Sequence, residues 1–156
     1  MMVKFDTVGT IVVGAAAIRA LHAYRQRPRA AERGGVLAGY RAGRRRWVVT
    51  HVSPPSARSL AGLFWVRRDR RDAQRFINRV FTEANGAVNY LGEWHTHPEA
   101  RPSPSAPDRK MLRDLLATSR LEIDFLLGVI VGQTGLLQWW CQTASGKFEE
   151  AIVEDS

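Results

Sequence analysis

The 156-residue sequence contains one cysteine, Cys141, which excludes an internal disulfide and a zinc cage built from several cysteines. A reducing compartment fits this composition, so we predict a cytoplasmic protein. No apolar run approaches the ~20 residues that a membrane-spanning helix needs, and no membrane association is expected. Acidic residues are also few, 15 against 23 lysines and arginines, and the net charge is +8. Such a charge suits nucleic acid or an acidic protein partner but predicts no fold.

The first residues have some features of a secretory signal peptide, because Lys4 precedes an apolar stretch from Val8 to Ile18. Asp6 weakens the positively charged start, and the same residues suit a strand followed by a helix. We therefore predict the strand and the helix. The length is that of one domain, and no internal repeat or linker divides it, so residues 1–156 are expected to form one domain.

Hydrophobic periodicity predicts strands interspersed with helices, at least two hairpins and an α/β architecture. The clearest helix has apolar residues at helical spacing from Ala73 to Ala84, with Asp69 as its N-cap and Asn85-Gly86 at its end. The other helices are expected over Ala15–Arg25 and Asp108–Ser119. Strands are expected over Phe5–Val13, Gly34–Tyr40, Trp47–Val52, Val88–His95, Ile123–Val131, Leu136–Gln142 and Lys147–Val153.

Two histidines at the end of a predicted strand form the strongest local signal. His95 and His97 lie two residues apart, so an extended strand would point both side chains to the same face. Pro98 cannot donate a backbone hydrogen bond and would end the strand there. Asp108, where a helix is expected to begin, could bring a carboxylate to the same point. Two histidines and one carboxylate leave a fourth position for water, as in catalytic zinc sites.

Each of these residues also has a purely structural interpretation. The two histidines could be one buried and one exposed residue without a metal. Ser105 and Asp108 match a capping box, with serine as the N-cap and aspartate at the third helical position. That interpretation is compatible with a ligand role, because a helix start holds a side chain firmly. Glu93 and Glu99 are rival carboxylates, and Glu93 shares a strand face with His95.

A hydrolytic metal site also needs a base that takes a proton from water and returns it to the leaving amine. Glu32 precedes Gly34-Gly35 at the start of a predicted strand. The glycines would let backbone or substrate come close to this carboxylate.

Together these residues resemble the motif of the JAMM (JAB/MPN) metalloprotease family. The resemblance covers most of the chain and implies a single-domain JAB1/MPN fold, which is cytidine-deaminase-like, with a mixed curved sheet flanked by about three helices. It implies that His95, His97 and Asp108 bind zinc, that Glu32 is general base and then acid, and that Ser105 donates to the oxyanion. The motif reads Glu32-x-Gly34-Gly35-Val36-Leu37-x-Gly39, then His95-x-His97-Pro98, seven residues, and Ser105-x-x-Asp108.

Within the family, the short single-domain sequence is similar to bacterial stand-alone deconjugating proteases of CBASS anti-phage operons and of ubiquitin-like conjugation operons. This similarity implies a zinc-dependent isopeptidase or peptidase that cleaves conjugates made through the C-terminus of a CD-NTase (cGAS-like) or ubiquitin-like protein. The implied partners are that C-terminal tail, laid against a sheet edge near the site, and an E1/E2-like conjugating enzyme. The sequence does not separate the two pathways.

The alternative is a RadC-like or non-catalytic MPN module that binds nucleic acid or protein. RadC-like proteins read His-Asn-His-Pro-Ser-Gly where this chain has His95-Thr96-His97-Pro98-Glu99-Ala100, so nucleic acid is not expected as a partner. Trp139 and Trp140 should face opposite sides of a strand, one of them in the core, and not form a platform for bases. The clusters Arg44–Arg46 and Arg67–Arg71 could be solvated surface or dock an acidic partner.

Overall fold

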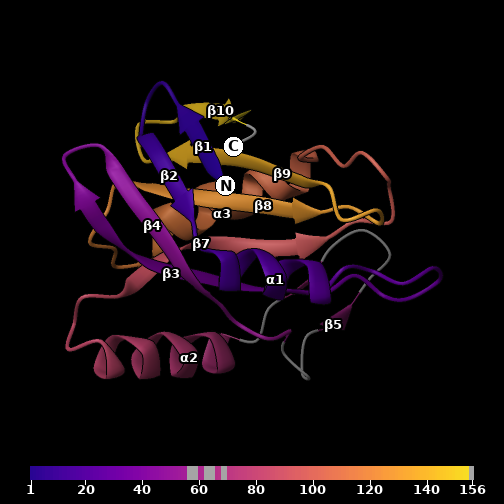
Figure 1. Ribbon diagram of the computed structural model, residues 1–156, viewed down its shortest axis with the longest axis horizontal. Coiled ribbons are helices and arrows are strands. Elements are labelled where there is room, and N and C mark those ends of the chain that lie inside the picture. The colour runs from indigo at the N-terminus through magenta and orange to yellow at the C-terminus, as the bar shows by residue number, and fades with distance from the viewer. Residues whose placement is uncertain (56–59, 62–65, 68–69, 155–156) are drawn as a thin grey trace.

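A computed structural model describes residues 1–55, 60–61, 66–67 and 70–154, and these residues form a mixed α/β fold (Figure 1). Their helices are α1 (Ala15–Ala23), α2 (Arg70–Glu83) and α3 (Ala106–Thr118), in agreement with the three predicted helices. None of the helices in these described ranges is long and apolar enough to cross a membrane. The strands are β1 (Met2–Phe5), β2 (Gly9–Val13), β3 (Gly34–Gly43), β4 (Arg46–Val52), β5 (Leu60–Ala61), β6 (Val66–Arg67), β7 (Asn89–Thr96), β8 (Phe125–Val131), β9 (Leu137–Thr143), β10 (Phe148–Glu150) and β11 (Ile152–Glu154).

One nine-stranded sheet organises the fold, with strand order β10-β9-β8-β7-β3-β4-β2-β1-β11, and β5 and β6 form a separate pair. At its centre, β7 is antiparallel to β3 and parallel to β8. A parallel pair needs a crossover connection, and α3 lies within it. Helix α1 packs on β4, α2 on β3 and β7, and α3 on β8 and β9 (Figure 1).

The strand β8 shows how the core is divided between the two faces of the sheet. Every residue of β8 is buried, which explains its continuous apolar run. Leu127, Val129 and Val131 join the core that also contains residues of α1. Leu126 and Ile130, which alternate with them, pack with α3. Helices α1 and α3 therefore cover opposite faces of the sheet.

The two adjacent tryptophans of β9 follow the same division. Trp139 packs in the core beside α1, and Trp140 packs in the core beneath α3. The predicted opposite orientation is confirmed. Both side chains are fully buried, however, whereas the sequence predicts only one in the core. The difference arises because helices cover both faces of this part of the sheet.

The end of α2 is closed as predicted. Asn85 and Gly86 both have positive φ angles, 51° and 83°, and the N–H of Gly86 donates to the carbonyl of Phe81 at 2.8 Å. This geometry terminates a helix and favours asparagine and glycine. At the other end, the predicted N-cap Asp69 lies outside the described residues.

Two predicted strands are each divided in the structure. The predicted strand Phe5–Val13 consists of the end of β1, a turn and β2. At the start of β2, Gly9 has a φ of 104°, and a Cβ there would lie 2.3 Å from the carbonyl oxygen of Arg45. The predicted strand Lys147–Val153 is divided at Ala151 into β10 and β11. These two strands pair with β9 and β1, at opposite ends of the sheet. Local hydrophobic pattern does not specify such a change of partner.

Because only Ala151 separates β10 from β11, the sheet must curl until its two end strands approach each other. The side chain of Glu149 makes the closing contact. Its carboxylate accepts hydrogen bonds from the hydroxyl of Thr7 and from the backbone N–H groups of Asp6 and Thr7. Burial acts to raise the pKa of Glu149, but these hydrogen bonds outweigh it and hold the pKa below its ordinary value.

Glu149→Gln should lower the melting temperature near neutral pH, and the difference from the wild type should shrink in acid. A carboxylate whose pKa is depressed in the folded state contributes stability above the unfolded pKa and loses it as the pH falls through the folded pKa. Thermal unfolding of both proteins from about pH 7 to about pH 3 measures this effect. Glu150→Gln, at an exposed neighbour, is the matched control. A difference that did not change with pH would contradict the role given to the ionised carboxylate.

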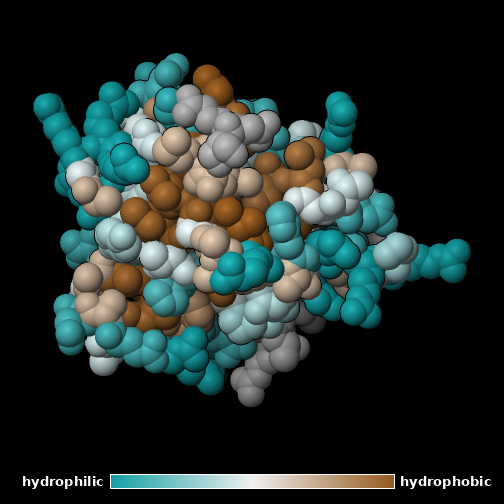
Figure 2. Space-filling view, in the orientation of Figure 1, coloured by the Kyte–Doolittle hydropathy of each residue, from teal (hydrophilic) through white to brown (hydrophobic). Residues whose placement is uncertain are grey.

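On the face drawn in Figure 2, hydrophilic side chains lie mainly around the outline and apolar ones gather in the middle. Arg44, Arg45 and Arg46 are exposed at the β3–β4 hairpin, where the predicted turn is confirmed. Arg45 donates to the backbone carbonyl of Asp6 at 2.5 Å. The second predicted arginine cluster, Arg67–Arg71, lies partly outside the described residues.

Candidate metal centre

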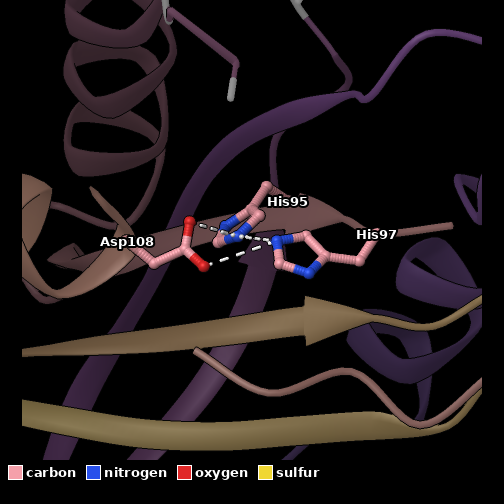
Figure 3. Close-up of side chains that lie close together, drawn as sticks. All are labelled: His95, His97 and Asp108. Carbon is pink, nitrogen blue, oxygen red and sulfur yellow. Dashed lines mark hydrogen bonds and ion pairs between the residues drawn. The ribbon is translucent and has the colours of Figure 1, made fainter. Parts of the chain in front are cut away.

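The site is built where the central strand β7 ends and α3 begins. His95 lies in β7, His97 follows one residue beyond its end, and both side chains are buried. The N–H of His97 donates to the carbonyl of Val131 at 3.1 Å, so the histidine remains fixed to β8 after β7 has ended. Pro98 is exposed outside the strand, which confirms that the chain leaves the sheet there. Asp108 reaches the histidines from the first turn of α3 (Figure 3).

The side chains of three candidate ligand residues converge at this point (Figure 3). Nε2 of His95 lies 3.1 Å from Nε2 of His97 and 3.0 Å from Oδ1 of Asp108. Nε2 of His97 lies 3.4 Å from Oδ2 of Asp108. The exposed fractions of the three residues are 5%, 7% and 4%, in sequence order. The sequence prediction that these residues come together is thus matched by the geometry.

The capping box predicted at the start of α3 is present. Oγ of Ser105 accepts from the N–H of Asp108 at 3.2 Å, and Oδ2 of Asp108 accepts from the N–H of Ser105 at 2.7 Å. The box therefore anchors Oδ2 and leaves Oδ1 directed at His95. The hydroxyl hydrogen of Ser105 is not used in the box, since the oxygen acts there as an acceptor. The capping box is confirmed, and its geometry is compatible with a ligand role for Asp108.

The electrostatics of the three residues are those of an ionised carboxylate beside imidazoles. For Asp108, burial acts to raise the pKa, but hydrogen bonds from His95 and His97 outweigh it and hold the pKa far below its ordinary value. For His97, burial acts to lower the pKa, and the hydrogen bond to Asp108 with nearby carboxylates raises it above its ordinary value. A cation at this position is therefore stabilised.

This donor set fits a metal ion. One nitrogen from each histidine and one carboxylate oxygen all lie within 4.8 Å of one another, and this is the one such group among the described residues. Two imidazoles with one carboxylate are typical ligands of zinc and of neighbouring transition metals. Nδ1 of His95 is buried without a hydrogen-bond partner, so the ordering of this ring is not explained by protein hydrogen bonds at that atom.

The rival carboxylates occupy other positions. Glu93 is buried and accepts a hydrogen bond from the hydroxyl of Tyr90. Oε2 of Glu99 lies 3.0 Å from Nδ1 of His97, whereas the nitrogen of His97 that lies near Asp108 is Nε2. Neither belongs to the three-residue group in the described part of the chain. The geometry therefore favours Asp108 as the carboxylate ligand.

Glu32 lies just before β3 and is buried, with an exposed fraction of 4%. Its pKa is raised to about 7, chiefly because burial disfavours the charged form, while His97 lowers it and Asp108 and Glu99 raise it. Oε2 of Glu32 is buried with no hydrogen-bond partner. A carboxyl group with these properties, near the ligands but outside the ligand group, suits a general base and acid.

The segment that carries Glu32 is held by a network that the sequence does not reveal. Thr96, between the two histidines, accepts from the N–H of Arg33 at 2.9 Å and donates to the side chain of Gln26 at 3.3 Å. The backbone N–H of Thr96 donates to the carbonyl of Arg33 at 2.9 Å, and Gln26 donates to the carbonyl of Ala30 at 2.6 Å. The residue between the ligands thus fixes the candidate base.

Gly35, the second glycine of the pair that follows Glu32, packs against the interior. The sequence predicts that the pair lets backbone or substrate come close to Glu32, and this stays a prediction. A Cβ on Gly35 would lie 2.3 Å from Oγ of Ser53 and 2.6 Å from Nε1 of Trp94. Those atoms are held in place, because Oγ of Ser53 accepts from the N–H of Val36 at 2.8 Å and Trp94 donates to the carbonyl of Ser53 at 3.1 Å. Gly35 is required by interior packing.

A groove of about 520 Å³ lies between α2 and the end of α3. Apolar side chains, among them Ile77, Tyr90 and Leu115, line it together with polar residues. Val36 also lines the groove and is paired with Glu93, two residues before His95. Tyr90 packs with the core beneath α3, where Trp140 contacts His95 edge to face. The groove and the metal centre thus share one face of the sheet.

The family model of prokaryotic homologs of the JAB domain matches residues 14–142, a range that includes Glu32 and all three ligand residues. The chain belongs to the prokaryotic JAB family. This membership confirms the resemblance to the JAMM (JAB/MPN) family that the motif predicts. It also confirms the JAB/MPN type of fold, with its mixed sheet and three described helices.

Two curated relatives of this JAB-family chain are named CD-NTase/cGAS isopeptidase. The Escherichia coli relative is 38% identical over 101 residues, which cover 64% of each chain. The Vibrio cholerae relative is 37% identical over 97 residues, which cover 62% of each chain. The matches thus span slightly less than two thirds of these relatives. The solution structure of a Desulfitobacterium hafniense protein has a TM-score of 0.57 at 20% identity, covers 90% of this chain and 88% of its own, and supports the fold alone.

Proposed function

We propose that this JAB-family protein is a zinc-dependent isopeptidase or peptidase of a bacterial anti-phage system. Its substrates would be conjugates formed through the C-terminus of a CD-NTase (cGAS-like) or ubiquitin-like protein. The observation that carries this proposal is the buried convergence of His95, His97 and Asp108 beside the carboxyl group of Glu32. The names of the Escherichia coli and Vibrio cholerae relatives support the first substrate class over the second.

Zinc is the proposed ion, with His95, His97 and Asp108 as its protein ligands. Two imidazole nitrogens and one carboxylate oxygen fill three of the four positions that zinc prefers and leave one open. When bound, zinc would lower the pKa of a water molecule toward ~7 and polarise the scissile carbonyl. The buried surroundings of the ligands strengthen these electrostatic effects, because little bulk water screens them.

The other residues supply proton transfer and a hydrogen bond. The unpartnered oxygen of Glu32 would accept the proton of the attacking water and then protonate the departing lysine ε-amine or peptide amine. Ser105 would donate its free hydroxyl hydrogen to the oxyanion while its oxygen continues to accept from Asp108. Removing one such donor typically costs ~3 kcal/mol of transition-state stabilisation.

The substrate tail needs a path to these residues. The sequence predicts that it lies against a sheet edge near the site. Because β7 is paired with β3 on one side and β8 on the other, such an edge must belong to another strand than the one that carries the first histidine. We propose the groove between α2 and α3 as the approach to the site, because it shares the face of the sheet with His95. An extended tail can follow such a groove without adding a strand to the large sheet.

The direct test is cleavage of a defined conjugate by the zinc-loaded protein. A CD-NTase joined through its C-terminal carboxyl to a target lysine should be released with a free C-terminus, as seen by gel shift and intact mass. A metal chelator should stop the reaction, and added zinc should restore it. A parallel ubiquitin-like conjugate distinguishes the two substrate classes. Failure to cleave either conjugate at full zinc occupancy would refute the proposed function.

A nucleic-acid-binding role has less support from the described residues. The exposed arginines Arg44–Arg46 follow the end of β3, whereas Glu32 precedes its start. Ten strand residues separate the two, which corresponds to roughly 33 Å. The basic hairpin is therefore remote from the candidate metal centre.

A further inference from the structure

We propose that Glu99 is a positioning residue of the metal centre, which holds the imidazole of His97 in the tautomer and orientation that present Nε2 to the ion. This inference rests on the metal site proposed above. Oε2 of Glu99 lies 3.0 Å from Nδ1 of His97. Nδ1 is the ring nitrogen that does not face the other ligands, so Glu99 can act on the ring without competing for the metal.

The hydrogen-bond inventory of the two groups determines the tautomer. An ionised carboxylate can only accept, so at 3.0 Å Nδ1 of His97 must carry the proton. A histidine binds a metal as neutral imidazole, and in that form protonation at Nδ1 leaves the lone pair on Nε2. That atom lies 3.1 Å from Nε2 of His95 and 3.4 Å from Oδ2 of Asp108, at the point where the ligand atoms converge. In the opposite tautomer, the lone pair of Nδ1 of His97 would face a lone pair of the Glu99 carboxylate, and the hydrogen bond would be lost.

The backbone around Glu99 is fixed by the turn between β8 and β9. The N–H of Gln133 donates to the carbonyl of Glu99 at 3.0 Å, and the hydroxyl of Thr134 donates to the carbonyl of Ala100 at 3.2 Å. A Cβ on Gly132 would lie 3.0 Å from each of these two carbonyl oxygens, so glycine allows the close approach. Although 59% of the Glu99 side chain is exposed, the backbone position from which it extends is therefore well defined.

His95 provides an internal contrast. Its Nδ1 is buried without a hydrogen-bond partner, and its ring packs edge to face on Trp140 with centroids 5.8 Å apart. Packing thus orients His95, whereas a hydrogen bond orients His97. Outer partners of this kind fix ring orientation and raise ligand basicity, and their loss typically costs 10–100-fold in metal affinity. For loss of Glu99 we expect the lower end of this range of affinity loss, because its carboxylate is largely hydrated.

The test compares zinc binding by the full chain and by variants at Glu99. Glu99→Ala should weaken zinc binding about tenfold in competition with a fluorescent chelator. Glu99→Gln keeps an oxygen that can accept from Nδ1 and should show a smaller loss. Glu150→Ala, which removes another exposed carboxylate, should bind zinc as the wild type does.

A second measurement reports on the ring itself. In the zinc-loaded protein, the Nδ1–H proton of His97 should exchange slowly with water in the wild type and in Glu99→Gln, and rapidly in Glu99→Ala. The corresponding proton of His95 should be unchanged in all three. Wild-type affinity and wild-type exchange in Glu99→Ala would overturn the positioning role while leaving the metal site intact. A wild-type protein that bound no zinc would overturn the metal site, and this inference with it.

Discussion

Glu32→Gln should retain zinc and lose at least about 10²-fold in the rate of conjugate cleavage, the range typical for loss of a general acid–base. The amide has the size of the carboxyl group but can neither accept the proton of water nor return it to the amine. Folding should be preserved, because the buried carboxyl already has a pKa of about 7 and a neutral group is tolerated there. Single-turnover cleavage at matched zinc occupancy measures the loss.

Glu150→Gln is the control for this experiment, since it makes the same chemical change at an exposed position. It should cleave at the wild-type rate. If Glu32→Gln cleaved nearly as fast as the wild type with equal zinc content, Glu32 would not be the base. A variant that lost zinc as well as activity would instead place Glu32 among the ligands, in disagreement with the three-residue group seen here.

His97→Ala should reduce zinc from about one ion per chain to background, because only one imidazole and one carboxylate would remain as ligands. Zinc should also cease to stabilise the fold. An ion that binds only the native state at 1,000 times its Kd adds about 4 kcal/mol to the free energy of unfolding. Elemental analysis and thermal unfolding with and without added zinc measure both effects.

His51→Ala is the matched control, because His51 is a half-buried histidine of β4 whose Nδ1 lies 2.7 Å from the hydroxyl of Thr50. It should bind zinc and respond to it as the wild type does. Equal zinc in His97→Ala and the wild type would show that the ligand set is wrong. Absence of zinc from every protein, even after supplementation, would leave His95, His97 and Asp108 as structural residues of a basic binding scaffold.

Sequence reasoning predicts that the candidate ligands come together because their spacing carries geometric information. Two histidines separated by one residue share a strand face wherever the strand lies, and Pro98 marks the point where the chain leaves the sheet. Ser105 and Asp108 mark a helix start through their own hydrogen bonds. These are local properties, and the structure agrees with each of them.

Long-range partners are not encoded in that way. The hydrogen bond between Gln26 and Thr96 joins residues 70 positions apart, and nothing near either residue indicates the other. The sequence also presents Glu99 as a rival ligand, because it cannot distinguish a carboxylate at Nδ1 of His97 from one at Nε2. Likewise, the apolar pattern around Ala151 shows strand character but not the change of pairing partner from β9 to β1.

The curl of the sheet has a consequence for the order of folding. Pairing of β1 with β11 places Val3 opposite Val153, so this contact closes almost the entire chain into a loop and carries a large entropic cost. Contacts with such separation tend to form late, whereas β8 and β9 are neighbours in both sequence and space. The candidate metal ligands lie in β7, just after it and in α3, away from the late pairing. We therefore expect partial opening at the chain ends, visible as fast amide exchange in β1 and β11, to leave the geometry of His95, His97 and Asp108 undisturbed.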